Sequence, residues 1–364
     1  MRIRILMLAL AVTLSAEAPW RPFNLGRHHR RVSTRVPAAQ QAFDQGLIWA
    51  YAFNHDEAVK AFEEAGRLDP GLAMAWWGIA LVNGPHINNP VLDDSHAKAA
   101  WEALAEAQKR GAGASPVERG LIAALARRYA QPNPADRRGL DEAYAAAMGE
   151  LAAKHPKDAD VAALTAEALM DVRPWDQWTR TGDPQPGTKE ILAMLKRSLS
   201  LAPNHPLALH LTIHATEASP HPEWGRAAAD RLRLLSPDAG HLVHMPGHTY
   251  ARIADWKGAA LANERAIEAD ARYKARRKEI GFYGLYMVHN ADFLAYTALM
   301  EGRKEVALTQ TKAVVDTFPL EWVVQNAPFV DSFQTRHWEG LKRFGMWTEL
   351  LAQPAPDPRL PVST

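Results

Sequence analysis

The sequence contains no cysteine, which excludes disulfides, thiolate catalysis and thiolate metal sites. Any bound metal ion must therefore be held by nitrogen, oxygen or methionine sulfur. An excess of charge of either sign is also lacking, because 42 lysine and arginine side chains stand against 41 acidic ones. This balance gives no reason to expect nucleic acid as a partner.

A hydrophobic run long enough to span a membrane is lacking as well. The apolar stretch Ile5 to Leu14 follows a positively charged start, and it is well short of the roughly 20 residues that a spanning helix needs. Small residues follow it, which is typical of a secretory signal peptide. We assign residues 1–18 to this signal and favour cleavage after Ala16, because Pro19 adjoins the alternative site after Ala18. The expected location is periplasmic or secreted.

Runs of β-branched residues are scarce, whereas alanine is abundant, and this favours closely packed helices over sheets. Small residues and prolines recur at the offsets of a 34-residue helix-turn-helix repeat, as with Pro203 and Pro237. We predict an all-α fold in which one continuous solenoid of roughly ten to fourteen helices covers residues 39–351. An N-terminal extension (19–38) precedes it and a C-terminal tail (352–364) follows. The positions that fit the repeat pattern are Gly46, Ala58, Phe62, Ala65 and Pro70, then Gly247, Tyr250, Ala259 and Ala266, then Ala295, Gly302, Ala307 and Pro319.

Some segments depart from the repeat. The composition of Asn83 to Pro90 predicts a loop, and Arg173 to Gly187, with two tryptophans and three prolines, predicts a long ordered loop. An insertion is expected near Tyr273 to Gly281. The basic run Arg27 to Arg31 is expected to be a solvated tail.

Histidines form two stripes at helical spacing. His210, His214 and Glu217 follow an i, i+4, i+7 pattern, which places all three on one helix face. A second stripe contains His241, His244 and His248, and Pro246 interrupts it, so that this helix is expected to start late or to kink. Six of the 15 histidines lie between His210 and His248, far more than an even distribution would place there.

The two stripes are in register with the repeat, since His244 and His248 each follow a histidine of the first stripe by 34 residues. Packed helices lie about 8–10 Å apart and an imidazole binds zinc at about 2.0–2.1 Å, so rings from adjacent helices can meet at one ion. His289 and Asp292 fall at the matching places of the next unit. We predict a metal site that holds copper or zinc, as one ion or two. The open alternatives are polar core packing inherited by repeat duplication and a metal-free catalytic or ligand site.

Whether the chain is an enzyme is left open. With zinc, the metal would activate a water molecule, and Glu217 or Glu167 would act as the general base. With copper, two ions held by three histidines each would give oxygen or redox chemistry. His86, in the loop at 83–90, is a further candidate for the same region, and His55 is expected to cap a helix. The remaining histidines outside the stripes that we expect to be isolated are His28, His29, His96, His155 and His337.

The sequence resembles the tetratricopeptide repeat (TPR) family from about Pro37 onward. More narrowly, it resembles a group of exported bacterial TPR proteins with a histidine-rich HLVHMPGH-type segment, here His241 to His248. The resemblance implies a right-handed superhelix whose first helices line a concave groove, with the histidines, Glu217 and Asp292 pointing into it. Such grooves bind a peptide or a partner protein, although Arg252 is the single evident basic clamp residue. The alternative function is therefore a scaffold for another exported protein or peptide, with the histidines in structural polar packing; oligomeric state stays open. The stretches that carry the resemblance are Phe53–Ala58, Trp76–Ala80, Ile213–Glu217 and His241–His248.

Overall fold

The computed structural model describes residues 22–278, 280–355 and 357–360, so the predicted signal peptide lies outside the described residues. Within these ranges the regular structure is helical, and the β-pairing consists of two isolated bridges, at His86–Asn89 and Trp178–Pro184. Both bridges fall in the two predicted loops. The predicted all-α fold is confirmed. Within the described residues, no helix combines the length and the apolar composition that crossing a membrane requires.

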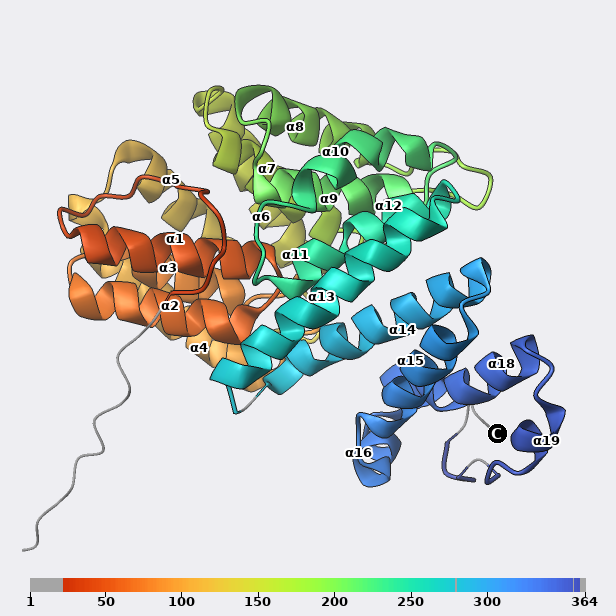
Figure 1. Cartoon of the computed structure of the whole chain (residues 1–364). Helices are drawn as coiled ribbons and strands as arrows, with labels where there is room; N and C mark the ends of the chain where they lie inside the picture. The colour runs from red at the N-terminus through yellow and green to blue at the C-terminus, as the bar shows by residue number, and fades with distance from the viewer. Residues whose placement is uncertain (1–21, 279, 356, 361–364) are drawn as a thin grey trace, which may run out of the picture.

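Successive helices pack as antiparallel pairs along the chain, beginning with α1 against α2 and α3 against α4 (Figure 1). In chain order the elements are α1 (Pro37–Tyr51), α2 (His55–Leu68), α3 (Ala73–Val82), α4 (Asp94–Arg110), η1 (Gly111–Gly113), α5 (Pro116–Leu125), α6 (Arg138–Lys154), α7 (Ala159–Asp171), α8 (Thr188–Leu201), α9 (Pro206–Glu217), η2 (Pro222–Gly225), α10 (Arg226–Leu232), α11 (Gly240–His244), α12 (Pro246–Arg252), α13 (Trp256–Arg276), η3 (Gly281–Tyr283), α14 (Gly284–Glu301), α15 (Lys304–Asp316), α16 (Leu320–Gln325), α17 (Ala327–Val330), η4 (Asp331–Thr335), α18 (Arg336–Arg343) and α19 (Trp347–Leu351).

Small residues at the repeat positions let the helices approach closely. A Cβ atom on Gly46 of α1 or on Gly78 of α3 would lie 2.6 Å from the ring of Phe62, which is nearer than real Cβ contacts. Phe62 on α2 therefore packs between the two glycines and joins the first repeat to the second. This is the physical basis of the glycine and phenylalanine offsets in the sequence pattern.

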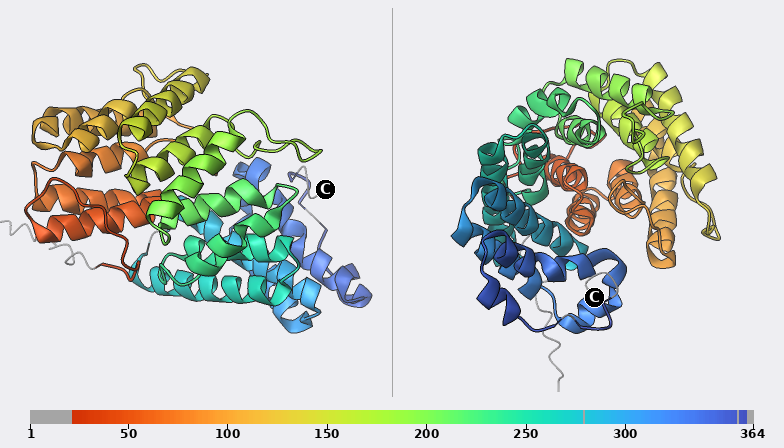
Figure 2. Two further views of the ribbon diagram at one scale, coloured as in Figure 1. Left: turned by 90° about the horizontal axis from the view of Figure 1, so that it is seen from above. Right: turned by 90° about the vertical axis from the view of Figure 1, so that its right-hand side faces the viewer.

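The pairs wind into a right-handed superhelix that returns onto its own beginning. In the right-hand view of Figure 2 the later helices curve around α1 and α2. The end of α1 contacts α9, and α2 contacts η3. The helix α9 and the turn η3 that precedes α14 thus contact the N-terminal hairpin, and His210, His214 and His241 on the inner side of α9 and α11 are buried.

The structure has nineteen α-helical segments within the described residues, more than the roughly ten to fourteen expected for a repeat solenoid. Most of the excess comes from short segments, such as α16 to α19, which have four to eight residues each. Pro246 divides α11 from α12 because proline has no N–H to donate. Met245 between them keeps helical angles (φ −50, ψ −38), so the predicted histidine stripe continues across the break.

The N-terminal extension is packed against the solenoid. Arg30 is 6% exposed and its guanidinium pairs with Asp158 at 2.9 Å and Asp160 at 3.2 Å. The prediction of a solvated tail was therefore wrong for Arg30 and for His28, which was expected to be isolated and contacts Asp160 at 3.1 Å. The other three residues of the basic run are exposed, as predicted. The basic run meets carboxylates at the start of α7, which are more than 120 residues away in the sequence. The predicted C-terminal tail also packs, since Leu360 is buried with Val323, Ala327 and Val330.

Replacing Arg30 with alanine is expected to lower the free energy of unfolding by about 3 kcal/mol, the low end for breaking a buried ion pair, because Asp158 and Asp160 lose their cation. Chemical denaturation measures this loss. Arg31→Ala is the matched control, since Arg31 is exposed, and it should change stability by less than about 0.5 kcal/mol. Equal effects of the two substitutions would contradict the packing of the extension.

Candidate metal centre

A first group of three histidines joins α9 to α11. His210 and His214 lie one turn apart on α9, and His241 lies on α11. One ring nitrogen from each lies within 4.8 Å of the others. The three residues are 0%, 4% and 1% exposed. We call this set the first trihistidine group.

A second trihistidine group lies beside the first and consists of His244, His248 and His289, from α11, α12 and α14. The Nε2 atoms of His244 and His248 are 2.8 Å apart, and those of His248 and His289 are 3.4 Å apart. Across the groups, the ring centroids of His241 and His244 are 5.8 Å apart. Two nitrogens bound at about 2.0–2.1 Å to one tetrahedral ion lie about 3.3–3.4 Å apart. These separations are close to those of ligands that share an ion.

The hydrogen bonds of the rings fix which nitrogen carries the proton. The backbone carbonyl of Tyr51 accepts from Nδ1 of His210 at 2.8 Å, and Oδ1 of Asn263 accepts from Nδ1 of His244 at 2.6 Å. The Asn263 amide is oriented by its own donation to the carbonyl of Ala259. Both histidines therefore carry the proton on Nδ1 and have a lone pair on Nε2.

Glu217 accepts from one histidine of each group. Its Oε1 lies 2.9 Å from Nδ1 of His214, and its Oε2 lies 2.7 Å from Nδ1 of His248. Burial by itself raises the pKa of Glu217, but the two histidines outweigh it and hold this pKa well below its usual value. Both histidines thus present Nε2 lone pairs as well, and a carboxylate behind a histidine is the common support of a metal ligand.

In each group, two Nε2 lone pairs therefore face each other. In the first group the Nε2 atoms of His210 and His214 are 3.0 Å apart. Adding a proton to relieve this repulsion is disfavoured, because burial lowers the pKa of His210, His214 and His244. His241 has no hydrogen-bond partner for either ring nitrogen among the described residues. Buried polar atoms are seldom left unpaired, and a cation between the nitrogens satisfies all of them.

Two aromatic residues with strained backbones border the first group. Phe53 has a φ of 56° and its ring lies 4.6 Å from that of His210. Trp175 has a φ of 61°, and its ring meets His214 edge-on at 5.0 Å. Left-handed backbone angles are costly for such residues and concentrate at functional sites. The loop that carries Trp175 is fastened to α9 by a hydrogen bond from Trp178 Nε1 to the carbonyl of Ala215.

Asp292 and Glu167 do not join either group. The Asp292 carboxylate lies 2.7 Å from the Arg336 guanidinium on α18. Glu167 lies on α7, where burial and the neighbouring Asp171 raise its pKa to about 8 against the opposing charge of Arg128. The structure therefore brings together the six predicted histidines and Glu217 and places the other two carboxylates elsewhere.

Two further histidines, His86 and His55, lie beside the site, and the sequence indicated the first as a candidate and gave the second another role. His86 is buried with its ring 4.5 Å from Phe53, as its candidacy for this region predicted. The cap of α2 is Asn54, whose side chain accepts from the Glu57 amide, so the capping role expected for His55 was wrong. His55 instead lies with its ring 4.5 Å from that of His86.

A third cluster consists of His28, Asp160 and His205, and nothing in the sequence connects these distant residues. Nδ1 of His205 accepts from the Ala208 amide at the start of α9. Its Nε2 therefore carries the proton and lies 3.1 Å from Asp160 Oδ1, within ion-pair distance but without the geometry of a hydrogen bond. This cluster consists of donors around one carboxylate, unlike the two trihistidine groups. The proline at 206, typical of the first residue of a helix, is the signal that marks His205 as a cap.

No known family model and no curated protein matches this chain. Among solved structures it is similar to the human IFIT1 dimer with m7Gppp-AAAA, at a TM-score of 0.45 and 13% identity, over 88% of this chain and 69% of that one. It is also similar to yeast Tom70 (TM-score 0.38, 13% identity, 86% of this chain and 69% of that chain). The P58(IPK) TPR domain matches at a TM-score of 0.23 and 12% identity, over 89% and 96% of the two chains. All are TPR-type helical repeat proteins, and the similarity is one of fold alone.

Proposed function

We propose that this chain is an exported TPR-like protein that binds two metal ions, one in each trihistidine group. The observation that carries the proposal is the arrangement of the imidazoles. Four of them donate Nδ1–H to fixed acceptors and turn their Nε2 lone pairs toward one another, at 3.0 Å in one pair and 2.8 Å in the other. Structural packing alone would pair each ring nitrogen with a donor or an acceptor.

Copper and zinc both accept imidazole ligands, and we favour copper. The ligands are six neutral imidazoles, and the one carboxylate of the centre, Glu217, contacts the Nδ1 side of the rings. The rings of His214 and His248 lie 6.2 Å apart across the two groups, so two divalent ions here would repel each other strongly. A monovalent copper ion carries half the charge of a divalent ion, so two such ions repel each other less. Bound copper would supply electron-transfer or oxygen chemistry, whereas bound zinc would supply an activated water.

Glu217 is better suited to orient the rings than to act as a general base. Both of its oxygens accept from histidines, and its lowered pKa makes it a weak proton acceptor. Glu167, with its pKa raised to about 8, is a member of neither group. We therefore assign no proton transfer to either carboxylate, and the proposal covers metal handling as well as catalysis.

Metal titration of chelator-stripped protein tests the proposal. Wild-type protein should bind two equivalents of Cu(I) or Zn(II), and the metal should raise its melting temperature, because a ligand that binds the folded state stabilises it. His244→Ala should lose one equivalent and most of that increase. His96→Ala, at an exposed histidine, should retain both equivalents.

A scaffold that uses the histidines for polar packing predicts a different result. His244→Ala would then lower the melting temperature equally with and without metal. Retention of less than about a tenth of an equivalent of either metal by the wild type would contradict the proposed site and favour the scaffold, whose groove would bind another exported protein or a peptide.

A further inference from the structure

Tyr51 connects the first trihistidine group to the third cluster. It is the last residue of α1 and is 1% exposed. Its carbonyl accepts from Nδ1 of His210 at 2.8 Å, and its hydroxyl donates to Asp160 Oδ1 at 2.8 Å. Tyr51 therefore links two parts of the molecule. Its backbone carbonyl orients the ring of His210, and its hydroxyl holds a carboxylate on α7.

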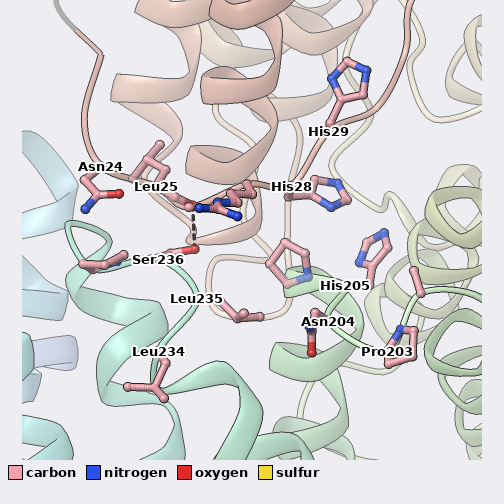
Figure 3. A pocket seen from close by; sticks show the side chains of 15 residues that line it. Asn24, Leu25, His28, His29, Pro203, Asn204, His205, Leu234, Leu235 and Ser236 are labelled. Carbon is pink, nitrogen blue, oxygen red and sulfur yellow. Dashed lines mark hydrogen bonds between the residues drawn. The ribbon is translucent and has the colours of Figure 1, made fainter.

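Asp160 is held from several sides. His28 Nε2 and His205 Nε2 each lie 3.1 Å from Oδ1, and Arg30 lies 3.2 Å from Oδ2. Figure 3 shows His28 from the N-terminal segment and His205 from the turn before α9 facing each other beside a cavity of about 640 Å³. Together with Tyr51, these contacts come from three segments of the chain, so the carboxylate fastens the extension, α1 and the start of α9 together.

This cluster does not hold a third ion. A metal would need the Nε2 lone pair of His205, but that nitrogen carries the proton because Nδ1 accepts from the Ala208 amide. The Arg30 guanidinium beside Asp160 also opposes a second cation. The observed donors already account for the charge of the carboxylate.

We propose that Tyr51 and Asp160 are positioning residues for His210, and that they set the metal affinity of the first trihistidine group. The carbonyl of the last residue of a helix has no partner within that helix, and helix ends fray. The bond from the Tyr51 hydroxyl to Asp160 holds this end in place and so fixes the carbonyl that orients the His210 ring. The second group contains no ligand in contact with Tyr51, and its affinity should not depend on this bond. The affinity part of this inference rests on the proposed function.

Tyr51→Phe removes the hydroxyl and leaves the carbonyl. Tyr273→Phe is the matched control, because Tyr273 is equally buried and its hydroxyl donates to Glu57 at 3.2 Å, away from either group. Each substitution is placed in two backgrounds, His289→Ala to isolate the first group and His241→Leu to isolate the second. Competition with a Cu(I) chelator should show about 10-fold weaker binding at the first group for Tyr51→Phe and less than about 2-fold change at the second. Asp160→Asn should reproduce this pattern if it folds.

A second measurement needs no metal. In stripped, ¹⁵N-labelled protein the Nδ1 proton of His210 should exchange slowly with water, and Tyr51→Phe should speed its exchange several-fold, whereas Tyr273→Phe should not. Unchanged exchange and affinity in Tyr51→Phe, or an equal loss of affinity at both groups, would overturn the positioning role. Faster exchange in a chain whose wild type binds no Cu(I) would sustain the positioning of His210 and reject the proposed metal function.

Discussion

Replacing Glu217 with glutamine is expected to weaken metal binding by about 10–100-fold at one of the two trihistidine groups, the one whose histidine meets the amide NH₂. The carboxylate accepts a hydrogen bond from His214 with one oxygen and from His248 with the other. A glutamine amide has one oxygen and one NH₂ group, so it can accept from a single histidine and must turn a donor toward the other. One ring then rotates or takes its proton on Nε2, and in either case it stops binding the ion. Chelator competition on each group, isolated as above, measures the loss.

The control is Glu223→Gln. Glu223 also pairs with a histidine, His221, at 3.1 Å, but this pair is exposed and lies outside both groups. The same chemical change there should leave both affinities within about 2-fold, since exposed pairs contribute little. A Glu217→Gln protein with normal affinity at both groups would show that the carboxylate does not orient the rings.

The sequence predicted the six histidines and Glu217 because helical spacing and the 34-residue repeat depend on local order along the chain. The sequence did not show which histidines belong to which trihistidine group. His241, His244 and His248 share one stripe, yet His241 belongs with α9 and the other two belong with α14. That division depends on how α11 is placed between its neighbours. The role of Glu217 was missed for the same reason, because one of its partners lies on another helix.

The repeat pattern predicted the fold well and the termini poorly. Gly46 and Gly78 mark close approaches to Phe62, which are local consequences of the repeat. The extension carries no such signal: a short basic run in isolation is usually solvated, and its burial depends on carboxylates such as Asp160 that the superhelix brings back to it. Contacts between distant segments follow from the winding of the solenoid, which the repeat spacing does not specify.

His241 offers the sharpest separation of the metal hypothesis from the scaffold hypothesis. Both of its ring nitrogens are buried without hydrogen-bond partners among the described residues. A buried polar group left unpaired costs about 1–3 kcal/mol, so His241→Leu should leave the free energy of unfolding of the metal-free protein unchanged or raise it. The same substitution removes a ligand of the first group. It should therefore bind one equivalent of metal in place of two and lose about half of the metal-induced stabilisation.

His205→Leu is the matched counterpart, because His205 is also 1% exposed but accepts from the Ala208 amide and lies 3.1 Å from Asp160. It should lower the free energy of unfolding of the metal-free protein by about 0.5–2 kcal/mol, through the lost cap, and keep both equivalents of metal. Denaturation curves of both variants, recorded with and without Cu(I), give the four free energies of unfolding. The metal hypothesis requires that the loss of His241 also removes one bound ion, because this ring has no other partner. It would be contradicted if His241→Leu destabilised the metal-free chain as much as His205→Leu and metal stabilised both variants equally. The buried imidazoles would then be packing residues.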